Sequence, residues 1–156
     1  MGAALVVAAP HVAAGELVGR VITVHDGDTL TVLVEKRQVK VRLVEIDAPE
    51  YGQPYGNRSW ASLAELCARK PARVTEAGRD KDGRTLGRVY CAGVDANAEQ
   101  VRRGMAWVFE RYATDASLYA AQEAARAARR GLWAWRKPIA PWEWRQAKEQ
   151  QRVLPH

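Results

Sequence analysis

Features that would define several other classes of protein are scarce in this 156-residue sequence. No apolar run approaches the ~20 residues that a membrane-spanning helix needs. The sequence also contains no internal repeat and no low-complexity linker. Its 47% hydrophobic and 27% charged residues are typical of one soluble globular domain, which excludes a disordered chain, a collagen-like repeat and a polytopic membrane protein.

Acidic residues are too few to balance the basic ones. The sequence has 18 Asp and Glu against 24 Lys and Arg, a formal charge of +6 and a pI near 9.6. A surplus of this size favours a polyanionic partner. A solvated basic surface would give the same count, so the charge alone does not assign a function.

The N-terminal segment lacks charge altogether, since residues 1–15 contain no Lys, Arg, Asp or Glu. The apolar run at residues 5–9 and the small residues at 12–14 are typical of the end of an export signal, although the usual basic start is missing. We therefore expect residues 1–15 to be a signal-peptide remnant and the processed protein to be secreted or periplasmic, without a membrane anchor. The alternative is an N-terminal segment that packs on the surface.

Cysteine is also rare. Cys67 and Cys91 allow one pairing, and they lack the spacing of a metal site. In an oxidising compartment the two thiols could pair, whereas in the cytosol both would be small buried hydrophobes. Taken alone, the sequence leaves both states open.

Hydrophobic periodicity predicts a small α+β domain with five strands and about three helices. The predicted strands are residues 19–25, 29–35, 39–46, 73–77 and 86–91, and the predicted helices are residues 59–70, 97–104 and 118–130. Asn97 is the expected N-cap of the second helix. These elements fit a five-stranded Greek-key β-barrel of the OB type at residues 16–135. Residues 136–156, which contain Trp and Pro, would form a tail packed on this domain.

Individual motifs carry little information. Asp26-Gly27-Asp28 between two alternating strands is a common hairpin turn. Asp47 and Glu50 beside a proline are ordinary polar residues at the end of a strand. Arg42 on an alternating strand is usually a solvated side chain on the outer face.

In combination, the motifs resemble the staphylococcal nuclease (thermonuclease) family over about residues 19–145. The spacing from Arg42 through Asp47 to Glu50 is specific. The resembling segments are residues 26–29, 42–50, 55–56, 80–84, 94–108, 131–133 and 141–145. The resemblance implies a monomeric OB-fold enzyme that hydrolyses phosphodiester bonds of DNA, RNA or both with bound Ca²⁺.

The resemblance further implies a site for the cation. Asp28 and Asp47 would hold it with their carboxylates, and the backbone carbonyl of Ala48 would add a ligand. Asp26 would lie close by, through water or as an outer carboxylate. A hard dication between carboxylates can neutralise phosphate oxygens and orient the attacking water, which is the chemistry that hydrolysis of an anionic diester requires.

The same resemblance assigns catalytic and substrate-binding roles. Glu50 would be the general base or the water-positioning group, because a carboxylate near the water can take its proton. Arg42 and Arg84 would grip the scissile phosphate with forked contacts that strengthen as negative charge builds in the transition state. Lys81 and Tyr112 would bind the substrate.

Three positions depart from the staphylococcal pattern, since Ala48 stands where a threonine is expected and Asp82 and Glu110 stand where tyrosines are expected. Fewer stacking faces and two additional acids concern substrate binding more than chemistry. The resemblance also places Cys67 on the helix that packs against the strand of Cys91. We therefore predict that the two cysteines pair in the exported protein.

The competing interpretation is a catalytically inactive OB-fold module that only binds nucleic acid. Such a module would lack one or more of the charged residues that the resemblance assigns to cation binding and catalysis. All of them are present, which favours the enzyme: Asp28, Arg42, Asp47, Glu50 and Arg84.

Overall fold

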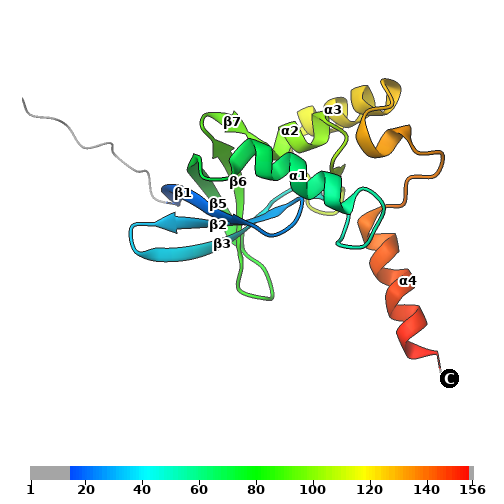
Figure 1. The fold of residues 1–156 in the computed structure, drawn as a ribbon, viewed down its shortest axis with the longest axis horizontal. Coiled ribbons are helices and arrows are strands. Elements are labelled where there is room, and N and C mark those ends of the chain that lie inside the picture. The colour runs from blue at the N-terminus through cyan, green and yellow to red at the C-terminus, as the bar shows by residue number, and fades with distance from the viewer. Residues whose placement is uncertain (1–14, 155–156) are drawn as a thin grey trace, which may run out of the picture.

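A closed β-barrel forms the centre of the computed structural model, which describes residues 15–154 (Figure 1). Its strands are β1 (Glu16–Val24), β2 (Thr29–Val34), β3 (Arg37–Leu43), β5 (Pro71–Arg79) and β6 (Thr85–Cys91). They pair antiparallel in the order β3-β2-β1-β5-β6, and a parallel pairing of β3 with β6 closes the barrel. The predicted α+β barrel of the OB type is confirmed. The predicted signal-peptide remnant lies outside the described residues, apart from Gly15.

Alternation of side chains along the strands explains how the barrel acquires its core. In β6, every second side chain from Thr85 to Cys91 is buried. The inward-facing positions of the barrel strands supply apolar side chains that have no exposed surface. These include Val21, Leu30, Val32, Val41, Leu43, Val74 and Val89.

Short strands and helices surround the barrel. The short strands are β4 (Ile46–Asp47), which pairs with β8 (Trp107–Val108), and β7 (Val94–Asp95), which pairs with β6. The helices are α1 (Gly56–Cys67), α2 (Ala96–Arg102), α3 (Ala116–Ala127), the 3₁₀ helix η1 (Gly131–Ala134) and α4 (Pro141–Val153). Within residues 15–154, no helix is both long and apolar enough to cross a membrane.

Helix α4 is an additional helix, since residues 136–156 were expected only as a tail packed on the domain. Pro141 occupies the first turn, where its missing N–H costs no hydrogen bond. The helix lacks an apolar face, and residues 146–154 are exposed. In Figure 1 α4 projects away from the barrel, so only the first half of the tail contacts the domain.

Two aromatic contacts anchor the beginning of α4. The Trp142 ring stacks on Phe109 with centroids 5.6 Å apart, and it meets the edge of Trp107, also at 5.6 Å. Trp107 lies in β8, which pairs with β4, the strand that ends at Asp47. The tail is thereby held beside the end of β4.

A disulfide joins the end of α1 to the end of β6. It links Cys67 to Cys91 across a sequence separation of 24 residues. Neither cysteine has exposed surface. The bond therefore lies in the core between the helix and the barrel.

The predicted N-cap of α2 is wrong. Asp95 caps the helix, and its side chain accepts a hydrogen bond of 3.0 Å from the backbone N–H of Ala98. Asn97 is fully buried instead, where its Oδ1 accepts from the Val89 N–H and its Nδ2 donates to the Val44 carbonyl. Both residue types are good caps, so local sequence does not separate them.

Candidate active site

The turn between β1 and β2 presents Asp26 and Asp28. The Asp28 N–H donates to Oδ1 of Asp26 at 2.9 Å, and the buried Gln100 side chain donates to the Gly27 carbonyl at 2.7 Å. A Cβ at Gly27 would lie 1.8 Å from Oγ of Ser59, so this position requires glycine. The turn that looks ordinary in the sequence is thus packed tightly against α1 and α2.

Arg42 on β3 connects the two carboxylates predicted to hold a cation. Its Nη2 lies 3.3 Å from Oδ2 of Asp28 and 3.3 Å from Oδ1 of Asp47. The Ala48 N–H donates to Oδ2 of Asp28 at 2.7 Å. Nη1 of Arg42 donates to the Ile46 carbonyl at 3.0 Å, which fixes the guanidinium. The structure therefore brings together four of the predicted site residues.

Burial makes the negative charges of this cluster costly. Asp28 is 6% exposed, and its burial raises its pKa to about 6 although Arg42 opposes the shift. Asp47 is 1% exposed, and burial also raises its pKa, against a hydrogen bond from Arg145. Two buried carboxylates close to each other favour cations at their oxygens.

Glu50 lies in the loop after β4, at the accessible side of the cluster, with 39% of its side chain exposed. Its Oε1 accepts a hydrogen bond of 2.6 Å from Nη1 of Arg145. The Nη2 atom of the same guanidinium lies 2.7 Å from Oδ2 of Asp47. The sequence motifs assign no role to Arg145. The only signal was its place in residues 141–145, a segment that resembles the family's C-terminal ending.

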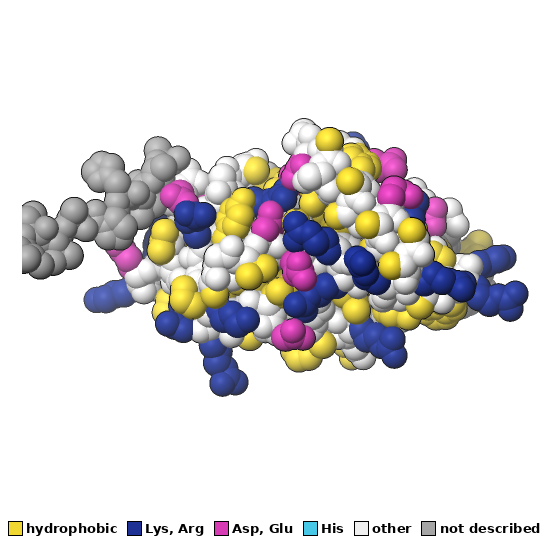
Figure 2. All heavy atoms as spheres, turned by 90° about the horizontal axis from the view of Figure 1, so that it is seen from above, with side chains coloured by type: hydrophobic (Ala, Val, Ile, Leu, Met, Phe, Trp, Pro, Cys, Tyr) yellow, Lys and Arg dark blue, Asp and Glu magenta, His cyan; other side chains and the backbone are white. Residues whose placement is uncertain are grey.

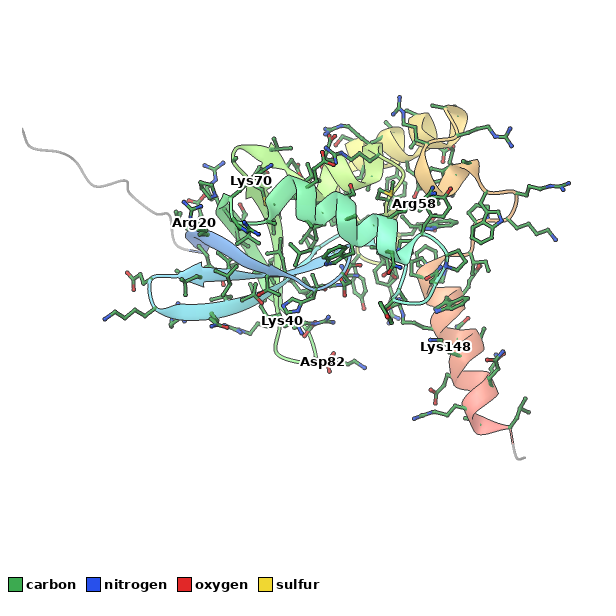
Figure 3. The ribbon with its side chains drawn as sticks, in the orientation of Figure 1. Arg20, Lys40, Arg58, Lys70, Asp82 and Lys148 are labelled. Atoms are coloured by element: carbon green, nitrogen blue, oxygen red, sulfur yellow. A yellow bond between two sulfur atoms is a disulfide. The ribbon has the colours of Figure 1, made fainter. Side chains whose placement is uncertain are left out.

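The structure does not bring Arg84 to the carboxylate cluster. Its Nε donates to Oδ2 of Asp80 at 2.6 Å, and its Nη2 lies 3.8 Å from Asp82. This loop projects beyond the barrel, with Asp82 near its tip in Figure 3. Leu86 pairs with Arg42 across β3 and β6, so residue 84 lies two positions from that pair on the same face of the sheet.

The two predicted substrate-binding residues lie in different loops. Lys81 is exposed in the same loop as Arg84. Tyr112 is 56% exposed, and its ring meets the edge of Phe109 with centroids 5.1 Å apart. Because Phe109 stacks on Trp142, Tyr112 ends an aromatic row that reaches α4.

A groove begins beside the Glu50 loop, with a volume of about 620 Å³. Gln53 lines this groove, and its Oε1 accepts the Glu50 N–H at 3.0 Å. The guanidinium of Arg58, which is labelled in Figure 3, lies 5.1 Å above the Tyr55 ring, and Trp135 forms another wall of the groove. The groove thus offers aromatic surfaces and a cation next to Glu50.

The donor atoms of the cluster suit a hard dication, because Asp28 and Asp47 supply carboxylate oxygens, the ligands that Ca²⁺ takes, and Asp26 lies in the turn beside Asp28. Within residues 15–154, no three Asp, Glu, His or Cys side chains form a ready metal-binding group. The protein would therefore provide few ligands, and water or phosphate oxygens would complete the shell. Arg42 and Arg145 now neutralise the carboxylates.

Comparison with known proteins shows which family the chain matches. The family described as staphylococcal nuclease homologue matches residues 40–135. The chain belongs to the staphylococcal nuclease family. An Escherichia coli protein described as an uncharacterized endonuclease is 47% identical over 131 residues, covering 83% of this chain and 86% of that protein. A Shigella flexneri protein named micrococcal nuclease is 42% identical over 142 residues, covering 84% and 82%.

Proposed function

We propose that the protein is a Ca²⁺-dependent endonuclease that hydrolyses phosphodiester bonds of DNA, RNA or both. The observation that carries this proposal is the meeting of Asp28, Arg42 and Asp47, with Nη2 of Arg42 3.3 Å from each carboxylate. Family membership and relatives named endonuclease and micrococcal nuclease support hydrolysis of nucleic acid.

Each residue has a distinct task in this proposal. When bound, the cation would neutralise phosphate oxygens and lower the pKa of water. Asp28 and Asp47 would hold it, with the Ala48 carbonyl as a further ligand. Glu50, which is partly exposed, would accept the proton of the attacking water.

Two arginines would stabilise the phosphate as negative charge develops. Arg42 is preorganised by its bond to the Ile46 carbonyl and lies in the cluster already. Arg84 would have to exchange Asp80 for the phosphate. Because Asp80 and Arg84 lie four residues apart in one loop, this exchange requires only a local rearrangement.

The distribution of charge on the surface supports binding of nucleic acid mainly through dispersed contacts with basic side chains. The net charge is +6, and Figure 2 shows Lys and Arg side chains dispersed among acidic ones on the visible face. Lys81 and Tyr112 would contribute a phosphate contact and a stacking face. The groove beside Glu50 adds Tyr55 and Trp135 as further aromatic surfaces.

We also propose that the protein acts as a monomer outside the cytoplasm, as a secreted or periplasmic enzyme. The Cys67–Cys91 disulfide supports this location, since such bonds persist in oxidising compartments. Cell fractionation with detection of the protein tests the location. Recovery from the cytosol with two free thiols would contradict it.

Cleavage assays on two variants test the proposed function. Glu50→Gln keeps size and polarity but removes the basic oxygen, so turnover should fall at least about a hundredfold while Ca²⁺ binding survives. Asp28→Ala should lose both Ca²⁺ affinity and turnover. Glu149→Gln is the matched control, because Glu149 pairs only with Arg152 of the same helix among the described contacts.

Single-stranded and duplex DNA and RNA should be incubated with Ca²⁺, Mg²⁺ or chelator. Full activity of Glu50→Gln would refute its role as base. Absence of Ca²⁺-dependent cleavage by the wild type, together with saturable nucleic-acid binding, would favour the inactive OB-fold binding module.

A further inference from the structure

Arg145 reaches the centre of the candidate site from outside the barrel. Its Nη1 lies 2.6 Å from Oε1 of Glu50, and its Nη2 lies 2.7 Å from Oδ2 of Asp47. A third contact, from Nη1 to Oδ1 of Asp47, measures 3.2 Å. One guanidinium thus binds the proposed base and a proposed cation ligand, which lie 95 and 98 residues earlier in the chain.

The position of Arg145 is set by contacts at the start of α4. Trp142, three residues before it, stacks on Phe109. Before the helix, the Ile139 carbonyl accepts a hydrogen bond of 2.7 Å from the Gln53 side chain. That same side chain accepts the Glu50 N–H at 3.0 Å. The Gln53 side chain therefore links the backbone of the Glu50 loop to the backbone just before α4.

The charges around Asp47 make this contact relevant to cation binding. Asp47 is 1% exposed and has two guanidinium partners, Arg42 at 3.3 Å and Arg145 at 2.7 Å. Arg42 has additional bonds to backbone carbonyls, which hold it in place. Arg145 is 44% exposed and contacts only carboxylates among its described hydrogen bonds, so it is the partner that can move.

We propose that Arg145 is a positioning residue of the catalytic centre, which orients the Glu50 carboxylate and acts at Asp47 as a counter-ion that a divalent cation displaces. This inference rests on the proposed function. A unit positive charge near a dication is repulsive even when solvent screens it. The guanidinium should therefore weaken cation binding in the free protein, while its contact with Glu50 supports turnover.

Arg145→Ala separates the two effects. Calorimetric titration of the nucleic-acid-free protein with Ca²⁺ should show affinity at least about tenfold tighter than that of the wild type, because the competing charge is gone. In cleavage assays at saturating Ca²⁺, kcat should fall at least about tenfold while KM changes less than about threefold, since the loss concerns orientation of the base. Arg145→Lys retains the charge without the forked guanidinium. Its Ca²⁺ affinity and its kcat should lie between those of the wild type and Arg145→Ala.

Arg152→Ala is the matched control, because Arg152 is an exposed arginine of the same helix that pairs with Glu149. It should match the wild type in both assays. A merely structural role of Arg145 predicts a lower melting temperature without tighter Ca²⁺ binding, and that result would overturn the inference. If the wild type cleaves and Arg145→Ala equals it in Ca²⁺ affinity and kcat, the inference fails alone. If the wild type does not cleave, the proposed function fails, and the calorimetric comparison still decides whether Arg145 competes with the cation.

Discussion

Loss of the Cys67–Cys91 disulfide should reduce stability by an amount that follows from its position. The bond closes a loop with a sequence separation of 24 residues. In the chain-entropy model, a loop of this length stabilises the folded state by about 3.5 kcal/mol at 25 °C. For a chain of this size, each 1 kcal/mol corresponds to about 3 °C, so the melting temperature should fall by about 10 °C.

Thermal unfolding of the oxidised and reduced protein measures this difference without changing other atoms. Both cysteines are fully buried, so reduction should be carried out in the unfolded protein before refolding with reductant. A Cys67→Ala/Cys91→Ala variant is the control, and its melting temperature should not respond to reductant. A difference below about 1 kcal/mol, or two alkylatable thiols in exported protein, would refute the reasoning.

Two further predictions concern electrostatics and substrate binding. Burial raises the pKa of Asp28 to about 6, so protonation of this carboxyl favours the folded state. The stabilising contribution of this one proton is fully present below about pH 4 and is lost as pH rises through about 6. Without divalent cations, Asp28→Asn should therefore be more stable than the wild type at pH 8, by on the order of 2 kcal/mol. Near pH 4 the two proteins should be equally stable. Chemical denaturation measures both differences, and a less stable variant at pH 8 would contradict this reasoning. The logarithm of the nucleic-acid binding constant should fall linearly with the logarithm of the salt concentration. The double variant Asp82→Tyr/Glu110→Tyr should steepen that slope and bind single strands more tightly through stacking. Unchanged affinity would mean that these two residues do not contact the substrate.

Local pattern determined much of the fold. Alternating apolar residues at 29–35 predicted a strand that the structure confirms as β2, and the strand predicted at 86–91 is confirmed as β6. Such periodicity is visible in sequence because successive side chains of a strand point to opposite faces, whatever its partners are. The predicted strand at 39–46 is nearly correct but breaks after Leu43, where Glu45 takes a positive φ of 69° and turns the chain into β4.

The sequence pattern did not predict α4, the helix that carries Arg145, because this helix lacks the periodicity that identifies the strands. Its residues show no apolar face, because only Pro141 is buried and the helix is held by ring stacking and charge. A pattern of burial cannot indicate an element that buries so little.

Residue spacing indicated the members of the site, and tertiary structure decided their partners. The sequence placed Arg42, Asp47 and Glu50 within one short segment, so their proximity follows largely from chain connectivity. The closure of the barrel by β3 and β6 and the contact of Arg145 with Asp47 join segments far apart in the chain. No local periodicity encodes such contacts, because they depend on how the whole core packs. For the same reason, only the structure shows that Arg84 pairs with Asp80 and that Arg145 pairs with Glu50, the proposed base.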